Sequence, residues 1–407
     1  MTDFIARVAL GESLTPVGQL RFTHAGPRQF STFSYDPAWI ENPRAFAIEP
    51  DFTLEAGPFH RSGQSANRRD ALAGVFADAA PDSWGRRLLE RAYGNGLSEF
   101  EYLTLSDDTC RQGAMRFLDE DGQVIRGNAE DSVPRLVDLE AITAIARAYE
   151  QGKEVSAEAM QALAGAGGSG GARPKANVRD GDDLWLAKFT SVHDQQPIER
   201  VEVATLRLAA ACGIRTPVAR LELADTPFPV ALIQRFDRRG VNRIPYISAR
   251  TALGKSGAEL GSYTEIVDFI RQYSPQPRQD FRELYRRLTF TILVSNKDDH
   301  LKNHGFLYVG GGQWRLSPCS TSILPPTATR IWKRRSWKAV RMIAQWRLRW
   351  RPASSSKSGS RKPATPFKGW HRRCPRHGAM RFERSAYPDR WQDPMSQRSF
   401  TTRWNSH

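Results

Sequence analysis

Residues 296–306, NKDDHLKNHGF, carry the most specific pattern in the chain. Asp298 and Asn303 have the spacing D-x-x-x-x-N, whereas Asp299 does not. In phosphoryl-transfer loops this spacing separates a carboxylate that orients the attacking hydroxyl from an amide that binds a metal ion. The stretch follows an apolar helix predicted over 281–296 and precedes a hairpin predicted over 305–317. A solvated polar end of a helix has a similar composition, so the pattern needs support from elsewhere.

That support comes first from a glycine-rich stretch and the segments after it. Residues 167–172 form a small-residue loop whose N–H groups could reach phosphates, although such runs are also common in linkers. Lys188 lies in a predicted strand, LWLAKF, where an ammonium could point at phosphates. Glu202 lies on a helix predicted over 197–211, where a carboxylate could hold that lysine. The alternatives are an edge-strand lysine and a surface glutamate.

The next apolar strand, PVALIQRF over 229–236, suits a hinge that faces an adenine ring, with Gln234 and Phe236 near the base. An ordinary buried strand has the same pattern. The order is more informative than any single segment. A glycine-rich loop, a strand lysine, a helix glutamate, a hinge strand, a D-x-x-x-x-N loop and a hairpin follow one another as they do in protein kinases.

Three motifs resemble the signatures of the HipA kinases, which are serine/threonine kinases of bacterial type II toxin–antitoxin modules. They are GGARPKA (170–176), QRFDR (234–238) and NKDDHLKNHGF. The opening segment is also similar to the family's amino-terminal subdomain, through VGQLRF, FSYDPAWI and PDSWGRRLL. The resemblance implies an α+β, two-lobed protein-kinase-like fold with an N-terminal β-rich subdomain. It further implies ATP and Mg²⁺ as cofactors, a protein substrate, and a HipB-like DNA-binding antitoxin that provides the only link to DNA.

The resemblance also assigns roles to residues. Asp298 would be the catalytic base, Asn303 would bind magnesium, and Glu202 would support Lys188. Ser169 lies near a regulatory serine that autophosphorylates in the family, in a register shifted by about one residue, and a linker serine is the simpler interpretation. The family usually has Glu at the position of Gln234. The residues expected to contact ATP are Gly170, Gly171, Ala172, Arg173, Pro174, Lys175, Lys188, Gln234, Arg235, Phe236, His300, Leu301, Lys302 and Asn303.

The net charge of +15 is unevenly distributed. Residues 319–407 hold 21 of the 59 Lys and Arg residues but only three of the 44 Asp and Glu residues, whereas residues 1–318 are slightly acidic. Tryptophans alternate with the arginines of this tail, at Trp332, Trp337, Trp346 and Trp350 among others. This composition would suit nucleic-acid binding through stacking and phosphate attraction. The tail has no sustained periodicity, and we expect it to be disordered.

The tail lacks a carboxylate that a kinase needs. A second metal-binding Asp should follow the hairpin, and the resemblance to the HipA family implies that it lies in an aromatic-Asp pair after Ser-Pro. Here Ser317-Pro318 leads into Cys319, and no Asp or Glu occurs from His300 to Phe382. A shifted reading of synonymous codons from Cys319 onward can encode Phe-Asp-Glu-Tyr. We therefore hypothesise that residues 319–407 are translated out of frame, and we expect a poorly stable chain with little or no activity as written.

Alternation of apolar and polar residues in FIARVAL, VGQLRFTHAG and FSTFSYD predicts strands, and the pattern of residues 82–93 predicts a helix. We interpret residues 106–135 as an acidic, turn-rich connector, and the continuously apolar end of the helix over 281–296 predicts burial.

These observations predict three parts. Residues 1–105 form the N-terminal subdomain, 106–318 a kinase domain with an incomplete C-terminal lobe, and 319–407 the basic tail. The four cysteines show no pairing pattern, no long apolar run predicts a membrane span, and no secretory signal is recognisable, so we expect a cytoplasmic protein without a membrane partner. Two functions remain open beside an active kinase. One is a catalytically dead remnant that binds only nucleotide or antitoxin, and the other is nucleic-acid binding through the tail.

Overall fold

The computed structural model describes residues 2–63, 68–126, 133–167, 171–256, 259–296 and 298–319. All of these belong to the first of the chain's two units, Met1–Ala364. Apart from Cys319, the tail, its tryptophans and its expected disorder lie outside the described residues, as do Ser169 and Gly170.

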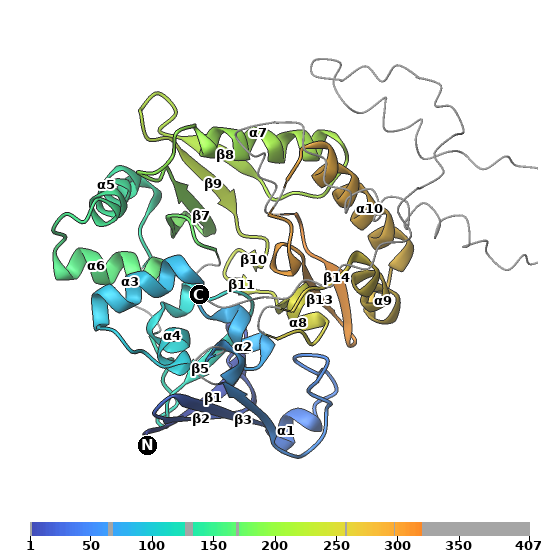
Figure 1. The fold of residues 1–407 in the computed structure, drawn as a ribbon. Helices are drawn as coiled ribbons and strands as arrows, with labels where there is room; N and C mark the ends of the chain where they lie inside the picture. Colours follow the sequence, from blue (N-terminus) through green and yellow to red (C-terminus); the bar gives the residue numbers. More distant parts are fainter. Residues whose placement is uncertain are drawn as a thin grey trace, which may run out of the picture. The chain divides into compact units, whose positions relative to one another are not determined.

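An antiparallel sheet of five strands begins the chain, in the order β4-β3-β2-β1-β5 (Figure 1). The predicted alternation of apolar and polar residues is confirmed in β2 and β3, where Leu20, Phe22 and Phe33 point into the core. The strands are β1 (Thr2–Leu10), β2 (Thr15–Ala25), β3 (Arg28–Tyr35), β4 (Phe59–Gly63) and β5 (Met115–Leu118).

Strand β5 corrects one prediction from the sequence. We interpreted residues 106–135 as an acidic, turn-rich connector, but Met115–Leu118 forms an edge strand that pairs with β1. All four of its residues are buried, so it lacks the alternation that identified the other strands. The N-terminal sheet therefore includes residues beyond 105, and the division of the chain at 105 stays a prediction.

Short helices connect this sheet to the rest of the molecule. The predicted helix over 82–93 is confirmed as α3 (Ser83–Tyr93), which begins after Asp82. The others are α1 (Pro37–Ile40), η1 (Arg68–Ala71), α2 (Gly74–Ala79), α4 (Glu99–Leu105) and η2 (Asp108–Cys110).

A second antiparallel sheet has the order β6-β7-β9-β8 and is covered on both faces. On one face, Trp185, Ala187 and Phe189 pack in a core with apolar residues of α3, α5 and α6. Helix α7 adjoins the other face through β8 and β9. The elements are η3 (Leu136–Asp138), α5 (Leu139–Glu150), α6 (Ala157–Ala166), β6 (Lys175–Asp180), β7 (Asp183–Phe189), α7 (Ile198–Ala211), β8 (Ala219–Glu222) and β9 (Val230–Gln234).

The last described part combines helices with a three-stranded sheet, β12-β13-β14. The predicted hairpin is confirmed as β13 and β14, joined through Gly311 and Gly312 at positive φ. The apolar run at the end of the predicted helix is buried in part: Phe290 and Val294 are buried, whereas Leu293 is 40% exposed. The elements are β10 (Arg238–Arg239), β11 (Asn242–Arg243), β12 (Tyr246–Ser248), α8 (Ala249–Ala252), α9 (Tyr263–Tyr273), α10 (Pro277–Leu293), η4 (Leu301–Asn303), β13 (Gly305–Gly310) and β14 (Gln313–Leu316).

One hydrophobic core joins this last part to the N-terminal sheet. Leu20 and Phe33 of the first sheet belong to the same buried cluster as Phe269 of α9, Phe306 of β13 and Leu316 of β14. The N-terminal region therefore packs as part of the kinase-like body, and the predicted α+β class is confirmed. Among the described helices, none is both long and apolar enough to cross a membrane.

Candidate active site

Lys188 and Glu202 form a buried ion pair, as the sequence predicted. Lys188 lies on β7 and Glu202 on the first half of α7, and Nζ of the lysine contacts Oε1 of the glutamate. Side-chain exposures of 11% and 2% place the pair almost wholly out of water. A pair in this environment holds its geometry, because separating the two charges would leave each without compensation.

Lys175, at the start of β6, lies directly opposite Lys188 in the strand register. Directly opposed residues of antiparallel strands point to the same face, so the two ammonium groups share the face on which Glu202 lies. Burial, reinforced by the positive charge of Lys188, lowers the pKa of Lys175 to about 7. This face therefore concentrates positive charge in a part of the molecule from which water is largely excluded.

The loop that leads into β6 is held by the start of α3. The indole Nε1 of Trp84 donates to the Lys175 carbonyl at 2.8 Å, and Arg87 donates to the Ala172 carbonyl at 3.2 Å. Gly171 has φ +103°, a backbone conformation that favours glycine, and a Cβ there would lie 2.6 Å from the flexible end of the Lys175 side chain. We call residues 171–175 the glycine cradle. Its backbone lies close to the Lys175 ammonium, which suits a ligand that must approach the backbone, such as a phosphate.

Arg173 and Pro174 serve this loop in different ways. The Arg173 guanidinium forms ion pairs with Asp194 and with Glu199 at the start of α7. The carbonyl of Pro174 accepts a hydrogen bond of 3.0 Å from the Phe189 amide. Both residues thus fix the loop to the sheet and to α7.

The predicted hinge residues follow β9. Gln234 is the last residue of that strand and is half-buried, and the ring of Phe236 lies against Tyr246. Arg235, by contrast, directs its guanidinium into the protein. Its donors bond to Asp237, to the Asn177 side chain, and to carbonyl groups of the N-terminal region.

This hinge network is buried and charged. Burial alone would raise the pKa of the Asp237 carboxyl, but the positive charges of Arg235 and Arg238 outweigh it and hold the pKa well below its usual range. Asp237 also accepts the Gly113 amide at 2.7 Å, so it connects the hinge to the chain just before β5. The side chain of Arg235, which we expected to contact ATP, therefore acts in the structure of the hinge.

The D-x-x-x-x-N loop brings Asp298 and Asn303 together. Nδ2 of Asn303 donates to the Asp298 carbonyl, and the Asp298 amide donates to the Asn296 side chain at 3.0 Å. The Asp298 carboxylate is 79% exposed, and His300 Nε2 lies 3.8 Å from its Oδ1. Leu301 packs towards Gly261, where a Cβ would lie 2.6 Å from its side chain. The loop thus presents a solvent-accessible carboxylate on a fixed backbone.

Asp299, which the sequence spacing excluded, anchors this loop. Its oxygens accept a hydrogen bond from the Tyr263 hydroxyl and lie 3.0 Å from His304 Nε2. Burial would raise the pKa of Asp299, but the hydrogen bonds from His304 and Tyr263 outweigh it and lower the pKa. The two adjacent carboxylates therefore differ in role, because one is buried and paired and the other is exposed.

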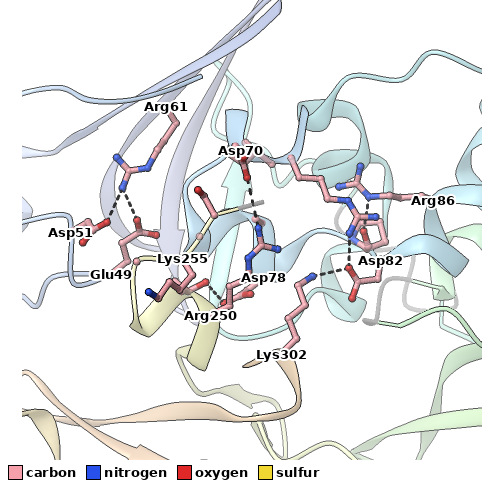
Figure 2. A pocket seen from close by; sticks show the side chains of 18 residues that line it. Glu49, Asp51, Arg61, Asp70, Asp78, Asp82, Arg86, Arg250, Lys255 and Lys302 are labelled. Atoms are coloured by element: carbon pink, nitrogen blue, oxygen red, sulfur yellow. Dashed lines mark hydrogen bonds and ion pairs between the residues drawn. The ribbon is translucent and has the colours of Figure 1, made fainter. Parts of the chain in front are cut away.

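Lys302 contacts a residue that we had interpreted only as part of the start of a helix. Its Nζ donates to Asp82 Oδ1 at 2.7 Å, beside the pocket that Figure 2 shows. Burial alone would raise the pKa of Asp82, but the charges of Lys302 and Arg69 outweigh it and lower the pKa to about 2. The pocket lies between the N-terminal region, α8 and the catalytic loop, and is lined largely by charged side chains.

The described residues fit a nucleotide better than they fit a metal ion. The glycine cradle and the two buried lysines match the phosphates. At the D-x-x-x-x-N loop, Asn303 offers an amide oxygen, but no group of three His, Cys, Asp or Glu residues that could hold a metal occurs in the described part of the chain. The aromatic-Asp pair that would complete the set has no counterpart up to Cys319. The reading-frame hypothesis stays a prediction.

The fold and this site define a protein of the kinase-like class. One chain of a solved complex, entitled "Shewanella oneidensis MR-1 Toxin Antitoxin System HipA, HipB and its operator DNA complex", has a similar fold. The TM-score is 0.55 at 17% sequence identity, over 78% of this chain and 76% of that one.

Family models identify the class more closely. The HipA N-terminal domain matches residues 6–113, and the HipA-like C-terminal domain matches residues 167–347, which extends past Cys319. The chain belongs to the HipA family.

Two curated relatives agree with this membership. A Sinorhizobium fredii protein named "Putative kinase Y4mE" is 27% identical over 333 residues, which is 74% of this chain and 76% of that protein. A Haemophilus influenzae protein named "Putative kinase" is 31% identical over 132 residues, which is 29% of this chain and 38% of that protein.

Proposed function

We propose that this chain binds ATP and transfers its γ-phosphoryl group to a serine or threonine hydroxyl of a protein substrate. The observation that carries the proposal is the buried ion pair of Lys188 with Glu202, opposite Lys175 and behind a glycine cradle. Glu202 fixes the Lys188 ammonium, while Lys175, whose pKa of about 7 leaves it partly protonated at neutral pH, adds further positive charge on the same face. Preorganised positive charge of this kind stabilises the charge that develops on phosphate oxygens.

Asp298 is the residue suited to act on the substrate. Bound ATP supplies the transferable phosphoryl group, and a bound Mg²⁺ neutralises phosphate charge. The Asp298 carboxylate accepts the proton of the substrate hydroxyl as the hydroxyl oxygen bonds to the γ-phosphorus, and the bond to the β-phosphate oxygen breaks to leave ADP. Its 79% exposure suits this task, because a protein substrate must reach it. Asn303, bonded to the Asp298 carbonyl, offers an amide oxygen to the metal.

The binding partner that we propose is inferred from a solved complex of the same family. The solved complex with a similar fold contains HipA, HipB and operator DNA. We infer that this chain binds a HipB-like antitoxin and reaches DNA only through it. The protein would then act in the cytoplasm, where ATP and the antitoxin's DNA are both present.

A specific observation favours a second function, that of a nucleotide-binding remnant. The described chain continues from β14 through Ser317-Pro318 to Cys319 without the carboxylate that binds the second metal ion in kinases. Such a remnant would bind nucleotide and antitoxin without turnover.

Nucleotide titration tests the shared part of both functions. We expect the chain to bind ATP, and the Lys188→Met variant to bind it at least about tenfold more weakly, because the lost ammonium meets phosphate. Lys255→Met is the matched control, since Lys255 pairs with Glu265 on the protein surface. Equal affinities for all three proteins, or no binding by the unmodified chain, would refute nucleotide binding at this site.

Radiolabelled ATP then separates a kinase from a remnant. Transfer of label to serine or threonine, lost in Asp298→Asn, supports the kinase, whereas binding without transfer supports the remnant. The gene should also be resequenced across codons 300–330. A frame change near codon 319 would mean that the natural protein has a different carboxy terminus, whereas confirmation of the frame would leave the remnant as the better description.

A further inference from the structure

The two carboxylate oxygens of Asp82 bind two loops that lie far apart in the sequence. Oδ2 accepts the Gly171 amide at 2.9 Å, and Oδ1 accepts Lys302 Nζ at 2.7 Å. Arg69 Nη1 also reaches Oδ1, at 3.2 Å. One side chain of the N-terminal region therefore joins the glycine cradle to the loop of Asp298, and Figure 2 shows Lys302 extending towards it.

The backbone around Asp82 is itself fixed against the cradle. The Trp84 amide donates to the Gly171 carbonyl at 3.3 Å, and Trp84 Nε1 donates to the Lys175 carbonyl. At Gly85 a Cβ would lie 2.5 Å from the Gly167 carbonyl oxygen, so the helix approaches the loop as closely as glycine allows. A carboxylate on so rigid a base transmits the position of one partner to the other.

The contact to Lys302 depends on charge. Asp82 is 17% exposed and Lys302 is 28% exposed, so the ion pair is only partly screened by water. Lys302 lies in η4, between Leu301 and Asn303, four residues after Asp298. Fixing its ammonium therefore restrains the segment that also carries the metal-binding amide. The low pKa of Asp82 keeps the carboxylate ionised at neutral pH.

We propose that Asp82 is a positioning residue that couples the phosphate cradle at Gly171 to the catalytic loop through Lys302, so that the N-terminal region completes the active site. Asp82 acts through these two contacts and touches no reacting atom. The effect on nucleotide binding rests on the proposed function, whereas the coupling of the two loops does not. A purely local ion pair is the alternative.

Backbone hydrogen exchange of the full-length chain without nucleotide tests the coupling. Asp82→Ala should speed exchange at least about tenfold both at residues 171–175 and at 298–304. Lys302→Met should also speed exchange at Gly171, which Lys302 does not contact, because Asp82 loses the charge that orients it. Asp82→Asn keeps an acceptor for the Gly171 amide but no charge, so its effect should be larger at the catalytic loop.

Asp51→Asn is the matched control, because Asp51 lines the same pocket and pairs at 3.5 Å with Arg61 alone. It should change neither segment. Exchange in β2 and β3 serves as the internal measure that each variant is folded. If Lys302→Met leaves Gly171 unchanged while exchange at its own segment rises, the contacts are local and the proposal is overturned. The same holds if Asp82→Ala affects only one of the two loops.

Nucleotide affinity provides a second, independent readout. If the two residues act as one unit, Asp82→Ala and Lys302→Met should each weaken ATP binding, and the double variant should bind within about twofold of the weaker single variant. If the double variant instead weakened ATP binding by the product of the two single effects, the two residues would not act as one unit. Failure of the unmodified chain to bind ATP would remove the proposed function, and the exchange experiment would still decide the coupling.

Discussion

The expected nucleotide side and the D-x-x-x-x-N loop of this chain differ in how their charged side chains are buried and paired. On the nucleotide side, Lys188, Glu202 and the Arg235–Asp237 pair are buried, and each charge has a partner. On the D-x-x-x-x-N loop, the Asp298 carboxylate is 79% exposed, and the His300 imidazole lies 3.8 Å from it. The difference teaches that the groups expected to hold phosphate are preorganised by burial, whereas the expected base is left accessible to a macromolecular substrate.

The largest expected effect on stability comes from removing the charge of Asp237, which lies in the buried ion-pair network next to the hinge. Asp237→Asn leaves Arg235 and Arg238 without their shared counter-charge, so we expect the free energy of unfolding to fall by about 3–5 kcal/mol. Urea denaturation followed by circular dichroism measures it. Asp268→Asn, which breaks an exposed pair with Arg271, is the control and should cost at most about 0.5 kcal/mol. If both variants lost a similar free energy of unfolding, burial would not explain the difference between the two ion pairs.

The next effect is the pH dependence of the free energy of unfolding that the buried Lys175 should cause. The pKa of Lys175 is about 7 in the folded chain and 10.5 in the reference state, so the unfolded chain binds more protons between these values. The free energy of unfolding should therefore rise with pH in this window. Relative to Lys175→Met, the rise should amount to about 2 kcal/mol from pH 7 to about pH 9. Parallel pH profiles for the two proteins would show that Lys175 titrates normally.

A smaller effect separates the two adjacent carboxylates. Asp299→Asn weakens the contacts with Tyr263 and His304 and should lower the free energy of unfolding by about 1–2 kcal/mol. The measurement is the same urea titration. A neutral result would mean that Asp299 does not anchor the loop.

The smallest effect on stability belongs to the expected base. Asp298→Asn should change the free energy of unfolding by less than about 0.5 kcal/mol and leave ATP affinity within about twofold, because the side chain is exposed. Any transferase activity should fall at least about a hundredfold. If Asp298→Asn retained phosphoryl transfer, the exposed carboxylate of Asp298 would not be the catalytic base.

The sequence predicted the elements that local patterns and chain order define. The strand of Lys188, the helix of Glu202 and the hairpin after Asn303 are confirmed because each rests on periodicity or turn residues. The contact of Asp82 with Lys302 was out of reach, because 220 residues separate the two and the local pattern predicted only a helix start.

Burial was equally hard to read from the sequence. Asp298 and Asp299 are chemically identical neighbours, and only tertiary packing makes one accessible and the other an anchor. Arg235 belongs to a motif that implied contact with ATP, yet its guanidinium bonds within the protein. Strand β5 was missed because burial on both faces removes alternation.

The shared hydrophobic core has a consequence for synthesis on the ribosome. Leu20 and Phe33 emerge early, but their core partners Phe306 and Leu316 emerge almost 300 residues later. At typical elongation rates of roughly 5–20 residues per second, this delay lasts on the order of tens of seconds. During that time the core that the N-terminal sheet forms with early residues such as Phe52, Phe76 and Phe100 lacks its last apolar members, so the nascent chain is a natural client for chaperones. A truncation before β13 leaves this core incomplete.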